Sequence, residues 1–146
     1  MILFRIGAWS MMLAAGGHFI AGLVDAIRPT VFVPVDPAAQ AAMRSTHMAL
    51  TARTDMWSAW LGFNIGFGLG IAAFAYLVDV IARRQPALMR ERAVLVAVLL
   101  VTAVLFATSI RYWFFAPSTA LGVSLVCFAL GAQKRPASSA PSRKPL

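Results

Sequence analysis

Two polar side chains interrupt long apolar stretches of this sequence. His18 lies within residues 6–24 and Asn64 within residues 56–78. Histidine is the one side chain whose unperturbed pKa lies near neutrality, so His18 is the candidate for any proton transfer, with Asp25 as the nearest carboxylate. Asp25 follows His18 by two helical turns, and the two side chains are therefore expected on one helix face.

His18 and Asn64 are expected at a similar depth, roughly 12 to 14 Å from the outer ends of their helices at ~1.5 Å per residue. One interpretation is an outward-opening ligand pocket with these two residues as its floor. Around its mouth would lie Asp25, His47, Trp57, Trp60, Arg111 and Tyr112. The other interpretation is a structural hydrogen bond between His18 and Asn64 that orients two helices.

The familiar catalytic and metal-binding motifs do not occur in the sequence. GxSxG, HExxH, P-loop and dinucleotide-binding patterns are all missing. Cys127 is the single cysteine, which excludes an intrachain disulfide and a CxxC metal or redox pair. A haem held between helices needs two facing ligands, and the second histidine, His47, lies outside the apolar stretches. The sequence therefore predicts no cofactor and no metal, and it favours a non-enzymatic protein.

The composition places these residues in a membrane. The chain has 146 residues, of which 60% are hydrophobic and 12% charged, with a mean hydropathy of +0.78. Four uncharged stretches can each cross a hydrocarbon core roughly 30 Å thick as a helix. We predict an all-α, four-helix transmembrane bundle within residues 1–133. Its helices are expected at residues 3–27, 56–82, 91–113 and 117–133.

Two segments outside the four predicted helices have sequence patterns that predict their structure. Asp36 followed by Pro37 is typical of a helix start, which predicts a short outer-surface helix over residues 37–50 between the first and second long helices. Thr54 or Asp55 is a plausible cap for the second long helix. Residues 134–146 are rich in proline, serine and basic residues, which predicts a disordered basic cytoplasmic tail.

The positive charges predict the orientation of the chain. The formal net charge is +8, and the basic residues gather in the link between the second and third helices and in the C-terminal tail. By the positive-inside rule, both termini of this multi-pass membrane protein are expected to be cytoplasmic. The basic residues are explained by this topology and by contact with lipid headgroups, so no nucleic-acid partner is expected.

Three glycines recur every four residues in the second long helix, at Gly62, Gly66 and Gly70. Small residues at this spacing let another membrane helix approach the backbone closely. The pattern predicts a helix-packing face, or equally the contact of a homo-oligomer. Gly66→Leu is accordingly expected to disrupt helix packing.

Several short motifs resemble a family of small, uncharacterised bacterial integral membrane proteins with four predicted helices. The motifs are Gly17-His18, Asp36-Pro37-Ala38, Trp57-x-x-Trp60-x-Gly62-Phe63-Asn64 and Arg111-Tyr112-Trp113-Phe114. The resemblance covers roughly residues 5–132. It implies a four-helix fold and a location in the bacterial inner membrane, but no activity. Family members often continue Gly-Phe-Asn with Ser-His, where this chain has Gly66-Phe67, which weakens a proton-transfer role for the second helix.

We therefore predict a membrane protein that binds a lipid or small apolar ligand in its outer half, or that assembles with a membrane protein partner. The alternative is a small membrane enzyme or proton-coupled carrier that uses His18, Asn64, Asp25 and Arg111.

Overall fold

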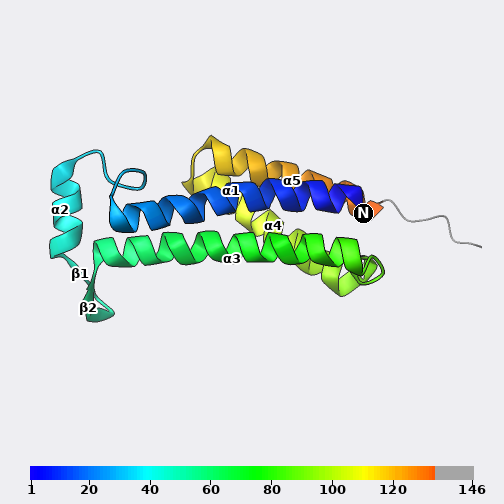
Figure 1. Cartoon of the computed structure of the whole chain (residues 1–146), viewed down its shortest axis with the longest axis horizontal. Coiled ribbons are helices and arrows are strands. Elements are labelled where there is room, and N and C mark those ends of the chain that lie inside the picture. The colour runs from blue at the N-terminus through cyan, green and yellow to red at the C-terminus, as the bar shows by residue number, and fades with distance from the viewer. Residues whose placement is uncertain (134–146) are drawn as a thin grey trace, which may run out of the picture. The chain divides into compact units, whose positions relative to one another are not determined.

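A computed structural model describes residues 1–133 and is all-α (Figure 1). Among these residues, four helices are long and apolar enough to cross a membrane: α1 (Ile2–Ile27), α3 (Met56–Arg84), α4 (Arg92–Tyr112) and α5 (Phe115–Gln133). The predicted fold class is confirmed, and each long helix begins and ends within two residues of its predicted limits. The predicted tail at residues 134–146 lies outside the described residues.

The chain divides into two compact units, which we describe separately. Unit 1 contains Met1–Gly7 and the chain from Val78 onward, which includes the end of α3, the short 3-10 helix η1 (Leu88–Arg90), α4 and α5. Unit 2 is Ala8–Leu77, which holds most of α1 and α3 and the segment that links them.

In unit 1, the start of α1 packs against the end of α5 through glycines that face aromatic rings. A Cβ atom built on Gly7 would lie 2.7 Å from the Phe128 ring, and one built on Gly131 would lie 2.8 Å from the Phe4 ring. The two rings stack on each other, with centroids 5.9 Å apart. The Ser124 hydroxyl also donates a hydrogen bond to the Gly7 carbonyl oxygen at 2.8 Å.

A buried carboxylate joins α1 to the end of α3 in the same unit. The Asp79 side chain is only 2% exposed and accepts from Arg5 Nε at 3.3 Å and from Arg83 at 2.8 Å. The two arginines satisfy both carboxylate oxygens, as a buried charge requires.

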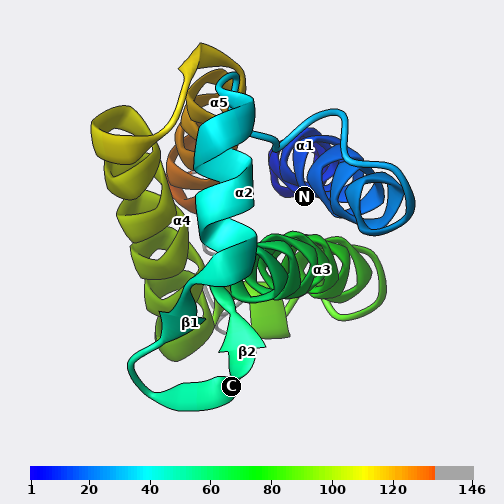
Figure 2. The ribbon, with the colours of Figure 1, turned by 90° about the vertical axis from the view of Figure 1, so that its left-hand side faces the viewer.

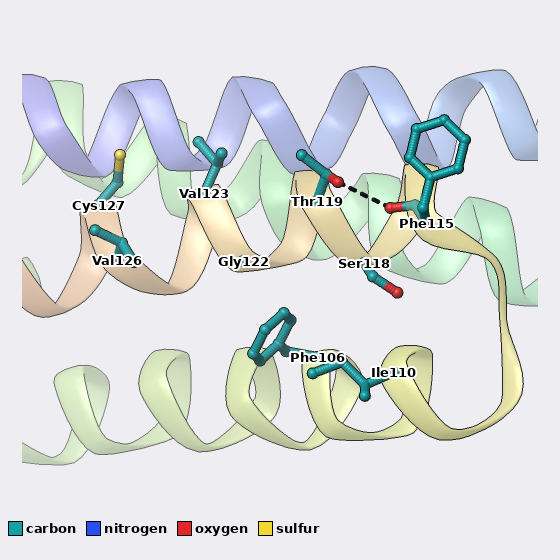
Figure 3. A pocket seen from close by; sticks show the side chains of 9 residues that line it. All are labelled: Phe106, Ile110, Phe115, Ser118, Thr119, Gly122, Val123, Val126 and Cys127. Carbon is teal, nitrogen blue, oxygen red and sulfur yellow. Dashed lines mark hydrogen bonds between the residues drawn. The ribbon is translucent and has the colours of Figure 1, made fainter.

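The short connection between α4 and α5 makes these helices antiparallel neighbours, as a link of two residues requires. Figure 3 shows them side by side, with the connecting turn at one end.

The linker of unit 2 differs in part from the prediction. The helix α2 (Pro37–Ser45) begins as predicted, because the Asp36 side chain accepts a hydrogen bond from the Ala38 N–H at 2.9 Å. It ends at Ser45, however, so the predicted limit near residue 50 is wrong. In its place a hairpin forms from β1 (His47–Met48) and β2 (Thr51–Asp55). The β-branched threonines 46, 51 and 54 favour this extended backbone.

Figures 1 and 2 show α2 beyond the ends of α1 and α3 that the linker joins, running roughly at right angles to both helices of unit 2, with the hairpin leading into the start of α3. Asp55 caps that start, as predicted. Its carboxylate accepts from the Ser58 N–H at 2.7 Å and from the Ser58 hydroxyl at 3.0 Å. These hydrogen bonds, the one from the Ser58 backbone above all, hold the pKa of Asp55 below its usual value.

Asp55→Asn should therefore reduce the acid sensitivity of the fold. Because the pKa of Asp55 is lower in the folded chain than in the unfolded chain, the cap stabilises fully above roughly pH 4 and is lost as the pH falls through the folded pKa. Asparagine keeps an N-cap acceptor but does not titrate in this range. The measurement is the thermal unfolding midpoint in detergent from about pH 6 to about pH 3. An equal acid-induced loss in both proteins would contradict the role of Asp55.

Candidate functional site

His18 and Asn64 meet across α1 and α3 in unit 2. His18 Nε2 lies 3.0 Å from Asn64 Oδ1, and Asn64 is only 4% exposed. The Asn64 amide nitrogen donates to the Trp60 carbonyl oxygen at 2.7 Å, which leaves the amide oxygen facing His18. His18 Nε2 is therefore the donor in this bond. The contact expected from counting depth along the two helices is thus present.

Two glycines allow α1 and α3 to approach closely around this hydrogen bond. A Cβ atom built on Gly68 would lie 2.8 Å from the Phe19 backbone nitrogen, and one built on Gly22 would lie 2.8 Å from the Ile65 side chain. Side chains larger than hydrogen at these positions would push the helices apart, so the glycines determine how near the polar pair can come.

The glycines of the predicted helix-packing face do not lie on the face of α3 that packs against α1 at Gly68. Gly62, Gly66 and Gly70 are exposed, and no atom lies within 4 Å of a Cβ atom built on any of them. Within unit 2, close packing therefore uses Gly68 and not the predicted repeat. The repeat identified a face with small residues, but spacing alone does not say which face meets the neighbouring helix.

Two aromatic rings contact the ring of His18, which is partly exposed. The Phe32 ring lies over His18 with centroids 4.6 Å apart, and Phe67 presents its edge at 6.2 Å. The indole Nε1 of Trp60 donates to the Phe32 carbonyl oxygen at 3.1 Å. Sequence reasoning missed Phe32, because it lies in an extended segment whose return toward α1 and α3 is not encoded by any periodic pattern.

Asp25 has a different role from the one predicted. Its carboxylate is 1% exposed and accepts hydrogen bonds from the backbone N–H groups of Thr30 (2.7 Å), Val31 (2.8 Å) and Phe32. The Thr30 hydroxyl lies 3.3 Å away as a fourth donor. The carboxylate oxygens of Asp25 therefore bond to the segment that follows α1. The predicted role of Asp25 in proton transfer with His18 is not supported.

The remaining residues that the sequence placed at the pocket have contacts of their own. His47 is exposed on β1, and Trp57 is buried with the Arg44 guanidinium 5.2 Å from its ring centroid. Arg111 and Tyr112 belong to unit 1, where the guanidinium lies 5.2 Å from the tyrosine ring centroid. Within residues 1–133, no three histidine, cysteine, aspartate or glutamate residues gather in a way that could hold a metal ion.

A separate groove opens between α4 and α5 in unit 1 (Figure 3). It has a volume of about 620 Å³ and is lined by Phe106 and Ile110 of α4 and by Phe115, Ser118, Thr119, Gly122, Val123, Val126 and Cys127 of α5. The two hydroxyl groups donate to backbone carbonyl oxygens four residues earlier in the chain, Ser118 to Phe114 O at 3.2 Å and Thr119 to Phe115 O at 2.9 Å. None of the residues predicted from the sequence to line a pocket lies in this groove.

Comparison with known proteins adds no relative. No protein family, curated protein or solved structure matches the chain.

Proposed function

We propose that the protein is a non-enzymatic, multi-pass protein of a bacterial inner membrane that binds a lipid chain or small apolar ligand between α4 and α5. The four apolar helices fit a multi-pass membrane protein. The groove is the observation that carries the proposed ligand, because its walls are almost entirely hydrocarbon and its volume is that of a small-molecule site.

The chemistry of the groove favours an apolar occupant. Its hydroxyl groups already donate to the backbone carbonyl oxygens of Phe114 and Phe115, so they have no need of a ligand acceptor. Both helices that line the groove are candidate membrane spans, so we expect lipid, and not water, to surround the groove. An acyl chain or a similar apolar molecule fits these conditions better than a charged metabolite does.

The alternative, an enzyme or proton-coupled carrier, has less support. Asp25 accepts four hydrogen bonds from residues 30–32. Because its carboxylate is engaged there, proton transfer between His18 and Asp25 has little support. His18 Nε2 is likewise used by Asn64. These contacts favour structural roles for the polar residues and leave ligand binding to the groove.

The proposal also includes the orientation of the chain in the membrane, the family to which it belongs and its assembly with other chains. The arginines at residues 83–92 favour a cytoplasmic location for that loop and for both termini. Membership in the resembled family is part of the proposal and rests on its motifs, of which His18, Trp60 and Asn64 form one hydrogen-bonded cluster in this chain. The exposed face of Gly62, Gly66 and Gly70 is available to a second copy or to a membrane protein partner.

A bulky side chain in the groove should displace the proposed ligand. Val126 lines the groove and is 57% exposed, while Val104 on α4 is 56% exposed and lies outside the lining. In nanodiscs that contain a fatty acid with a diazirine on its chain, photolabelling of the groove residues should fall on the order of tenfold in Val126→Trp. Val104→Trp is the matched control and should label as the unmodified protein does.

Peptide mapping by mass spectrometry gives the readout. Labelling that is spread evenly over all lipid-facing helices of the unmodified protein, or that is equal in the two tryptophan variants, would refute a ligand site in this groove.

A further inference from the structure

An ion-pair cluster lies where α1 begins and α3 ends. Its members are Arg5, Asp79 and Arg83, all of unit 1. The Asp79 side chain is 2% exposed, and its two oxygens accept from Arg5 Nε at 3.3 Å and from Arg83 Nη2 at 2.8 Å. The two guanidinium groups are therefore neighbours that one buried carboxylate holds in place.

The cluster carries more positive than negative charge. Two guanidinium groups share a single carboxylate, so one positive charge is left unbalanced. Arg84, Arg90 and Arg92 add positive charge from the end of α3 onward. Glu91 is the only carboxylate among residues 80–92. An anion that approaches this part of unit 1 thus meets a positive potential.

Each arginine of the cluster keeps hydrogen-bond donors for a ligand. A guanidinium group carries several N–H donors, and the contact with Asp79 uses one nitrogen of each arginine. The side chains of Arg5 and Arg83 are 42% and 43% exposed, which leaves donors accessible. The planar guanidinium group matches the geometry of phosphate oxygens, and a phosphate has enough oxygens to accept from both arginines.

The position of the cluster favours a phosphate that is carried by a lipid. The helices α1 and α3 are both candidate membrane spans, and Arg5 lies in the first turn of α1 while Arg83 lies in the last turn of α3. The end of a membrane span meets the headgroup region, where lipid phosphates are concentrated and attract arginine side chains. Free phosphate has the same chemistry but no reason to gather at this level.

We propose that Arg5 and Arg83, positioned by Asp79, form a binding site for the phosphate of an anionic lipid headgroup. A buried ion pair often stabilises a fold less than packed apolar residues of the same volume do. What Asp79 provides is a fixed position for two guanidinium groups. The site is independent of the α4–α5 groove, because it shares no residue with the groove lining and binds a headgroup instead of an apolar chain.

Lipid retention by the full chain tests the headgroup preference. The purified protein is immobilised and equilibrated with detergent micelles that contain equal amounts of phosphatidic acid and phosphatidylcholine with identical acyl chains. Bound lipid is extracted and quantified by mass spectrometry. Lipid bound elsewhere, including in the groove, adds equally to both and creates no preference. In the unmodified protein the ratio of bound phosphatidic acid to bound phosphatidylcholine should be roughly three or more.

Three substitutions locate the preference. Asp79→Asn adds one positive charge and should raise any non-specific attraction for anionic lipid, but it weakens the contacts that hold both arginines, so the ratio should fall to about one. Arg83→Lys keeps the charge but loses the planar fork, so it should also lower the ratio, and it serves as the test if Asp79→Asn does not fold. Arg84→Lys is the matched control and should keep the ratio, because Arg84 is not one of the two arginines that bond to Asp79.

Competition with inorganic phosphate separates the two sources of phosphate. With the ionic strength matched by chloride, inorganic phosphate equimolar with phosphatidic acid should leave the ratio unchanged. Loss of the preference in this competition would show that the site binds free phosphate, and it would overturn the lipid assignment. A ratio of one in the unmodified protein, an unchanged or higher ratio in a folded Asp79→Asn or in Arg83→Lys, or an equal fall in Arg84→Lys would each overturn the site itself.

Discussion

Gly68→Ala is expected to lower the thermal unfolding midpoint in mild detergent by roughly 10 °C, whereas Gly66→Ala, two residues earlier in α3, should leave it unchanged or slightly higher. The added Cβ at position 68 would lie 2.8 Å from the Phe19 nitrogen and 3.0 Å from its Cα. Both atoms are backbone, so no side-chain rotation relieves the clash. Overpacking of this kind costs about 3 kcal/mol, well above the ~1 kcal/mol that alanine gains in helix propensity.

Gly66→Ala provides the matched control because a Cβ there meets no atom within 4 Å. The comparison also reverses the sequence-based expectation that Gly66→Leu disrupts helix packing, since Gly66 contacts no helix within unit 2. A larger loss of stability in Gly66→Ala than in Gly68→Ala would show that the Gly62, Gly66 and Gly70 face is the main contact, for example between two copies of the chain.

Gly7→Ala should destabilise unit 1 by about 2 kcal/mol. Its Cβ would lie 2.7 Å from the Phe128 ring and 3.0 Å from the Ser124 carbonyl oxygen. Phe128 is fully buried and stacked on Phe4, so the ring has little room to move. The loss should appear as a lower unfolding midpoint in the same detergent assay.

A double-mutant cycle tests whether the ring causes this loss. Phe128→Leu alone leaves a cavity and should cost roughly 1 to 2 kcal/mol, but the smaller side chain also makes room for a Cβ at position 7. The double variant should therefore lose roughly 1 kcal/mol less than the sum of the single losses. Gly16→Ala on the same helix is the control, because nothing lies within 4 Å of its Cβ. Strict additivity would refute the contact.

The sequence by itself determined the membrane class, the limits of the long helices and the local caps. Apolar run length sets a membrane span, and Asp36 and Asp55 act on N–H groups only two or three residues away, so both features are local. Counting residues from the helix ends also brought His18 and Asn64 to one level, because the rise of a helix is constant.

Only the tertiary structure decided which faces meet and where the connecting chain goes. In lipid the surroundings are as apolar as the packed faces, so hydrophobic periodicity does not mark the side of α3 that contacts α1, and Gly68 could not be distinguished from Gly66. The partners of Asp25 and the position of Phe32 depend on the path of residues 28–35, and the groove depends on the spacing of α4 and α5. These features arise from contacts between separate segments, whose geometry no local pattern of residues contains.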